Sequence, residues 1–224
     1  MTTAPTAVDD TAITDVVAAE APGLNRTWSK IAFWGIVIFV VGYCGVLLAA
    51  MGVQVFGNEK PCPLCMLQRY AMILATIPAM WIVADALRGK LTRARYASGL
   101  GMSIVAATCG GFESTRQILL HIASKTDPGY GSAVVGLHLY TWALITFVIV
   151  ILFCGVALIC SGSVIPEAPT DGALRTLARV IEIGFLAVIA INVVLIILLE
   201  GFSWVLPDDP THYKLINDLG FGLH

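Results

Sequence analysis

The sequence predicts an all-α integral membrane protein, and three observations support this fold class. Of the 224 residues, 58% are hydrophobic and 12% are charged, whereas a soluble domain is about half apolar and about a quarter charged. The mean hydropathy is +0.85. Several uncharged runs are also long enough for a helix to cross a hydrocarbon core of about 30 Å. Because the net charge is only −2 and no basic block occurs, we expect membrane lipid around the chain and no nucleic-acid partner.

Five membrane-spanning helices are predicted, four in one bundle and one added at the C-terminal side. The second helix carries one charge, Arg69, and one proline, Pro78, which neighbouring helices can accommodate. The expected helices cover about residues 31–51, 62–84, 96–122, 135–160 and 180–199.

The distribution of Lys and Arg predicts the orientation, because short loops rich in these residues stay in the cytoplasm. Eight of them fall on one side of the expected spans, which places the N-terminus in the cytoplasm and the C-terminus outside. They are Arg26, Lys30, Arg88, Lys90, Arg93, Arg95, Arg175 and Arg179.

The segments outside the spans complete the expected domain organisation. The first 25 residues contain four acidic residues and no Lys or Arg, which is typical of a disordered tail. Near the C-terminus, Asp209 can cap and Pro210 can begin a short helix on the outer membrane surface. The expected divisions are a cytoplasmic tail at 1–25, the bundle at 26–160, a cytoplasmic linker at 161–179, the fifth helix at 180–200 and an interfacial tail at 201–224.

The segment from Pro61 to Tyr70 carries the chemistry that the sequence predicts. Cys62 and Cys65 lie three residues apart at a helix start, where unpaired N–H groups and the helix dipole stabilise a thiolate. Such a pair can form a disulfide and exchange it with another thiol. Arg69 follows Cys65 by four residues, on the same helix face and about 6 Å deeper in the membrane. A cation there favours an anion between itself and the sulfur.

Arg116 and the cysteine pair each have a purely structural interpretation as an alternative. Arg116 lies near the outer end of the third span and could share a pocket with Arg69, or it could simply pair with Glu113 at the i, i+3 spacing. The two cysteines could form an inert disulfide. We expect no metal site, because structural zinc usually needs four Cys or His ligands and only one CxxC pair is present.

Three segments resemble the disulfide bond formation protein B (DsbB) family of quinone-linked membrane thiol oxidases. CPLCMLQR, residues 62–69, looks like the active motif of that family. STRQILLHI (114–122) is similar to the end of its third span, and GLHLYTW (136–142) to the start of its fourth. The resemblance covers about residues 31–155. It implies a four-helix bundle in the bacterial inner (plasma) membrane, to which this chain adds a fifth helix.

The resemblance also implies roles for individual residues. Cys62 would exchange with a periplasmic thioredoxin-like thiol protein, and Cys65 would face a membrane quinone, ubiquinone or menaquinone. Arg69 would bind near the quinone ring, with Gln68 and Arg116 as further cofactor-binding residues. The implied activity is electron transfer from a periplasmic dithiol through the CxxC pair to the quinone.

The chain departs from the family in one respect. Family members carry a second cysteine pair in a long outer loop after the third span, whereas here this connection, about residues 123–134, has no cysteine. Two functions therefore remain open: an oxidoreductase that takes electrons directly at Cys62, or a non-catalytic structural or quinone-binding subunit of a larger membrane complex. We expect the remaining cysteines to be small buried apolar residues: Cys44, Cys109, Cys154 and Cys160.

Overall fold

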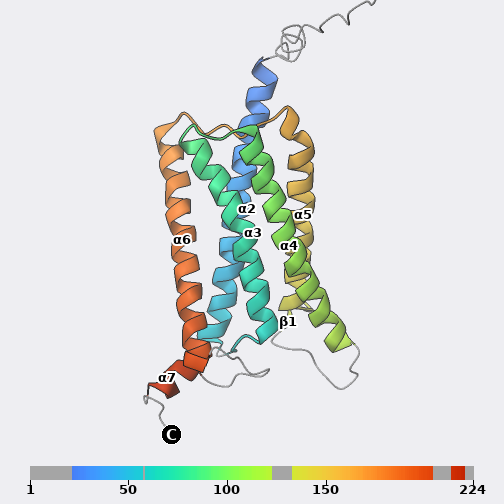
Figure 1. The fold of residues 1–224 in the computed structure, drawn as a ribbon, viewed down its shortest axis with the longest axis vertical. Coiled ribbons are helices and arrows are strands. Elements are labelled where there is room, and N and C mark those ends of the chain that lie inside the picture. The colour runs from blue at the N-terminus through green and yellow to red at the C-terminus, as the bar shows by residue number, and fades with distance from the viewer. Residues whose placement is uncertain (1–21, 58, 123–132, 204–212, 220–224) are drawn as a thin grey trace, which may run out of the picture.

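The computed structural model describes residues 22–57, 59–122, 133–203 and 213–219. Within these residues the chain forms five long helices, a two-stranded antiparallel hairpin and three short helical segments (Figure 1). Their bounds are α2 Pro22–Phe56, α3 Pro63–Leu87, α4 Arg93–Ile122, β1 Ala133–Val134, β2 Leu137–His138, α5 Leu139–Ile159, η1 Cys160–Gly162, α6 Gly172–Glu200, η2 Gly201–Ser203 and α7 Lys214–Asp218.

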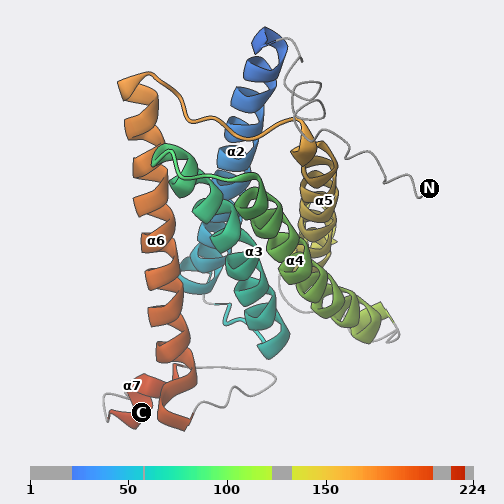
Figure 2. The ribbon, with the colours of Figure 1, turned by 45° about the horizontal axis from the view of Figure 1, so that its top comes forward.

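Helix α3 lies in the middle of the bundle. α4 packs along both α3 and α5, while α2 packs against α3 and α6. α6 therefore lies on the side of the bundle away from α5 (Figures 1 and 2). The start of α2, the turn from α3 to α4 and the linker from α5 to α6 share one end, which we call the basic end. The opposite end, which we call the cysteine end, holds the start of α3, the hairpin and α7.

The predicted fold class is confirmed: this is an all-α, multi-pass membrane protein. Four helices are long and apolar enough to cross a membrane, namely α2 from Arg26, α3, α5 with η1, and α6. α4 is not among these four, because polar residues such as Ser103, Glu113 and Gln117 interrupt its apolar sequence. It nevertheless runs beside α3 and α5, in the place expected for the third of five helices.

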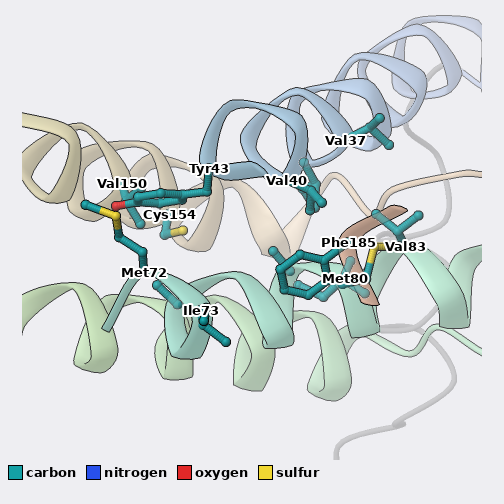
Figure 3. Close-up of a cluster of buried hydrophobic side chains, with 14 of the residues drawn as sticks. Val37, Val40, Tyr43, Met72, Ile73, Met80, Val83, Val150, Cys154 and Phe185 are labelled. Carbon is teal, nitrogen blue, oxygen red and sulfur yellow. The ribbon is translucent and has the colours of Figure 1, made fainter. Parts of the chain in front are cut away.

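The middle of the bundle is an apolar core to which all five long helices contribute. Figure 3 shows part of it, with Val40 of α2, Met80 of α3, Val150 of α5 and Phe185 of α6 in one cluster. Close packing of α4 on α5 depends on Gly110, because a Cβ at this position would collide with the ring of Phe147. The core thus fixes the relative positions of the helices whose ends form the site described below.

The start of α3 is determined by Cys62, Pro63 and the N–H group of Cys65. Cys62 is the N-cap residue, with an extended backbone and a sulfur that accepts a hydrogen bond from the Cys65 N–H at 3.3 Å. Pro63 follows in the first turn, where its missing N–H has no helical partner to lose. α3 then continues through Pro78 to Leu87. This start places both cysteines at one end of a long buried helix.

Helices α5 and α6 begin at residues other than those expected, and each difference has a local cause. α5 begins at Leu139 instead of near residue 135, because Val135 and Gly136 have positive φ angles of 54° and 78° and turn the chain between β1 and β2. α6 begins at Gly172, well before residue 180, since the Asp171 side chain accepts a hydrogen bond from the Ala173 N–H at 2.9 Å and caps the helix. The linker is therefore shorter than the expected 161–179.

The terminal segments are only partly described. α2 already begins at Pro22, inside the expected tail 1–25, and residues 1–21 lie outside the described residues. The expected cap Asp209 and helix start Pro210 also lie outside them. The short helix that the structure does describe in the C-terminal tail is α7, which begins at Lys214.

Candidate redox site

Cys62 and Cys65 lie side by side at the first turn of α3. Both are free cysteines, and their Sγ atoms are 2.7 Å apart. Cys62 is buried, with 7% of its surface exposed, and Cys65 is half-buried. Because the sulfurs are already adjacent, formation of a disulfide requires only a small movement of the side chains. The geometry therefore allows this pair to alternate between dithiol and disulfide.

A glutamine of α4 contacts both sulfurs. Nε2 of Gln117 donates to Sγ of Cys62 and to Sγ of Cys65, each at 3.4 Å. The amide is oriented by Gln68, whose Nε2 donates to Oε1 of Gln117 at 2.8 Å. Both glutamines are buried. An N–H group directed at a sulfur stabilises negative charge on it, so Gln117 favours the thiolate form of the pair.

Arg69 is buried next to this pair and is directed towards α2. Its Nη1 donates to Oε1 of Gln54 at 2.6 Å, and its Nη2 donates to the carbonyl oxygen of Ala50 at 2.9 Å. Both acceptors are neutral, and no carboxylate pairs with Arg69 within the described residues. Buried charges are normally matched by opposite ones. The Cys65 sulfur, one turn earlier on α3, lies within electrostatic range of the guanidinium.

The two sulfurs differ in their tendency to ionise. The hydrogen bond to the Cys65 sulfur raises the pKa of the Cys62 thiol above its ordinary value, and burial raises it further. Burial and this hydrogen bond thus favour the protonated form of Cys62. Cys65 is the sulfur nearer to Arg69 along α3.

The structure does not bring Arg116 to the cysteine pair. Arg116 is exposed, while its neighbour Gln117 is fully buried against the sulfurs. Successive residues of a helix point about 100° apart, so α4 cannot direct both side chains to one place. Glu113 and Arg116 form no ion pair within the described part of the chain. The simple structural pairing considered for these two residues is therefore not found.

The remaining cysteines lie away from the site. Cys154 is buried and Cys44 half-buried, as expected for small apolar residues, but the same expectation is wrong for Cys109 and Cys160, which are exposed. Their helices turn them towards the outer surface of the bundle rather than its core. Across the described ranges, no group of three or more His, Cys, Asp or Glu residues could hold a metal ion.

An apolar groove of about 380 Å³ opens between α2 and α5. Met72, three residues after Arg69 on α3, lies in one cluster with Tyr43 and Val150 from the walls of this groove (Figure 3). The groove therefore begins about one helical turn below Arg69. Its lining residues include Gly35, Phe39 and Tyr43 of α2 and Thr146, Val150 and Phe153 of α5.

The structure places four residues that the sequence singles out, Cys62, Cys65, Gln68 and Arg69, together with Gln117 and Gln54, which the sequence does not single out. Gln117 lies in the STRQ segment, but a charge within a span is the stronger sequence signal and points to its neighbour Arg116. Gln54 carries no comparable signal, since it is an uncharged residue near the end of α2. Gln54 lies eight residues before Cys62 in the sequence, and this separation alone does not indicate that α2 packs Gln54 against Arg69.

Comparison with known proteins gives one match. Residues 31–128 match the family model described as disulfide bond formation protein DsbB. The match begins in α2, includes α3 and α4 with the residues of the site, and ends before α5. No curated protein and no solved structure matches the chain.

Proposed function

Because residues 31–128 match the family model of disulfide bond formation protein DsbB, we propose that the chain is a quinone-linked membrane oxidoreductase of that family. In this proposal the protein oxidises a periplasmic dithiol through Cys62 and Cys65 and passes the electrons to a membrane quinone. The observation that carries the proposal is the buried Arg69, which lies one turn from Cys65 and has only neutral partners among the described residues.

The first half of the reaction is thiol–disulfide exchange. A thiolate of the partner protein attacks Sγ of Cys62 in the oxidised pair, the Cys62–Cys65 bond breaks, and Cys65 leaves as a thiolate. Gln117 and Arg69 stabilise this leaving group through the amide N–H and the positive charge. The second thiolate of the partner then displaces Cys62, so that the partner departs as a disulfide and the pair remains reduced.

The second half restores the disulfide of Cys62 and Cys65, which requires removal of two electrons and two protons from the pair. Bound quinone supplies this oxidising capacity and leaves as quinol. The residues present fit such a group. Arg69 offers charged N–H donors to a ring oxygen, and Nε2 of Gln54 is a buried donor with no partner among the described residues. The apolar groove one turn below suits a prenyl tail.

The remaining predicted site residues take supporting places in this proposal. Gln68 acts through Gln117, whose amide it orients. Arg116 would contribute from the outer surface of α4, because it is exposed. Ubiquinone and menaquinone both carry two ring oxygens, so the arrangement suits either.

We propose the bacterial inner membrane as the location, with the cysteine end in the periplasm. The basic end gathers Lys and Arg residues in the segments that connect the helices, which favours its retention in the cytoplasm. This orientation presents Cys62 to a periplasmic thioredoxin-like thiol protein. It also leaves the N-terminus in the cytoplasm and α7 in the periplasm.

Thiol trapping of native membranes, with and without added quinone, tests the proposal. In the parent protein, quinone should return Cys62 and Cys65 to the disulfide after reduction by a dithiol protein. A variant of the thiol protein that lacks its second cysteine should accumulate as a mixed disulfide with Cys62 of the parent, with Cys65 released as a thiol. Cys62→Ala should form no such mixed disulfide, whereas the matched variant Cys109→Ala should behave as the parent.

If the pair stays oxidised whatever the quinone supply, and the parent traps no thiol protein that lacks its second cysteine, the oxidoreductase proposal fails. Copurification of membrane proteins in fixed stoichiometry would then favour the subunit function. The sequence feature behind that alternative is the absence of a second cysteine pair in the connection at 123–134.

A further inference from the structure

Helix α6 contacts α3 at both ends of the bundle, including the helix turn that carries the cysteines. At the basic end, Nη2 of Arg175 donates to the carbonyl oxygen of Leu87 on α3 at 2.6 Å. At the cysteine end, Ile196 and Leu199 of α6 pack against Met66 of α3. We call these three residues the α3–α6 cluster. Since Met66 directly follows Cys65, α6 packs against the helix turn that carries the cysteines.

Tyr213, the residue directly before α7, contacts the chain on both sides of the cysteine pair. Its ring packs against the α3–α6 cluster, which contains the residue after Cys65. Nζ of Lys60, two residues before Cys62, lies 5.7 Å from the centroid of the same ring. One aromatic side chain therefore links the segment entering α3 to the outer end of α6.

The position of α7 is in turn held by contacts with the end of α6. Oδ2 of Asp218 accepts a hydrogen bond from the N–H of Phe202 at 3.0 Å. Gly201 has a positive φ of 63°, and a Cβ at this position would collide with the Asp218 carboxylate. These contacts keep Tyr213 close to α3 although residues 204–212, which connect α6 to α7, lie outside the described residues.

We propose that Tyr213 is a positioning residue of the redox site, which holds the segment Lys60–Cys62 against α3 and α6 and thereby controls the access of incoming thiols to Cys62. Thiol–disulfide exchange depends on access to the attacked sulfur. Only 7% of the Cys62 surface is exposed, so attack on its sulfur requires a local opening. In this proposal the opening separates Lys60, two residues before Cys62, from the Tyr213 ring. The physiological meaning of this control rests on the proposed function, but the control itself does not.

The test measures the alkylation rate of Cys62 by N-ethylmaleimide in the full-length protein in lipid nanodiscs. A Cys65→Ser background leaves Cys62 as the only thiol of the pair, and peptide-resolved mass spectrometry separates it from the exposed Cys109, which serves as an internal reference. Tyr213→Ala should raise the Cys62 rate about tenfold, because a local opening no longer breaks the aromatic contacts. Tyr213→Phe keeps the ring and should remain within about twofold of the parent.

The control variant is Ile216→Ala, because Ile216 lies on the exposed side of α7. It should leave the Cys62 rate unchanged. Should Tyr213→Ala fail to fold, Asp218→Ala provides a second test, since it releases α7 from Phe202 without touching the α3–α6 cluster; it should also accelerate alkylation. Parental Cys62 rates in a folded Tyr213→Ala or Asp218→Ala protein overturn the inference.

Activity measurements separate this inference from the proposed function. With Cys65 restored, Tyr213→Ala should alter the dependence of the rate on the concentration of the thiol protein and leave the KM for quinone unchanged. If the parent shows no quinone-dependent oxidation but Tyr213→Ala still accelerates alkylation, the proposed function fails and the positioning role stands. An altered KM for quinone with an unaltered alkylation rate would remove Tyr213 from this role.

Discussion

Helix α3 carries a buried charged residue near each of its ends, and the two residues have different kinds of partner. Near the basic end, Asp85 is 4% exposed and its Oδ2 accepts a hydrogen bond from Nη1 of Arg95 at 2.7 Å. The same guanidinium lies over the ring of Trp81. Near the cysteine end, Arg69 is 7% exposed, and its hydrogen-bond partners within the described residues are neutral oxygens.

The comparison indicates a structural role for one charge and a chemical role for the other. The ion pair with Arg95 neutralises the Asp85 carboxylate, so this group has no unpaired charge to offer a ligand. The charge of Arg69 is solvated by dipoles but not neutralised, and it therefore stabilises negative charge that appears nearby during a reaction. The four variants below test this difference, from the largest expected effect to the smallest.

Arg69→Ala should lower quinone-dependent oxidation of a dithiol protein by about a hundredfold, which is the usual effect of removing one charge-stabilising donor. The measurement is steady-state quinone reduction in nanodiscs. The free energy of unfolding should change little, because the deletion also removes the cost of keeping a cation buried. Arg69→Lys retains the charge but not both hydrogen bonds, and should recover part of the rate. An unchanged rate in Arg69→Ala would place the charge outside the site.

Arg95→Ala should instead destabilise the protein, by about 2 kcal/mol, because it leaves the Asp85 carboxylate buried without its partner. Unfolding in mixed micelles with increasing denaturing detergent measures this change. Asp85→Ala is the matched control and should cost less, since Arg95 is half exposed and can be solvated by water. The oxidation rate of the folded variants should equal that of the parent; a large loss of rate would mean that the basic end also contributes to the chemistry.

Gln117→Leu should lower the rate of thiol exchange at the cysteine pair by about tenfold, because the sulfurs lose a directed N–H donor. Leu has a similar volume, so α4 should remain packed on α3. Stopped-flow reduction of the oxidised pair by a small dithiol measures the rate. Gln68→Leu provides the comparison: it removes only the group that orients the amide, and its effect should be the smaller of the two.

Arg116→Ala should have the smallest effect, at most about twofold on the rate, since an exposed charge is screened by its surroundings. The assay is the same quinone reduction in nanodiscs, with KM for quinone as the main quantity. A several-fold increase in that KM would show that Arg116 takes part in quinone binding from the outer surface of α4.

The arrangement of the spans and the core of the site could be predicted from the sequence for simple physical reasons. Uncharged runs of membrane length are not compatible with other folds, and a helix of fixed pitch places residues 65 and 69 on one face. The start of α6 is harder to predict from the sequence, because the capping residue Asp171 lies nine residues before the strongly apolar run begins at residue 180.

The parts of the site contributed by other helices could not be predicted in the same way. The choice between Arg116 and Gln117 depends on the rotation of α4 about its axis, which is set by close contacts such as Gly110 against Phe147. Gln54 and Tyr213 come from segments on either side of α3, and only packing brings them to it. These contacts depend on how each helix is rotated about its own axis, and this rotation cannot be read from a single sequence.

The fifth crossing made by α6 also decides where the chain continues. A bundle of four crossings would return it to the basic end, whereas here α7 lies at the cysteine end. A fluorescent protein or affinity tag fused after α7 would therefore be held next to the reactive sulfurs and obstruct approaching partner proteins. Imaging and purification labels are better attached before α2, at the opposite face of the membrane.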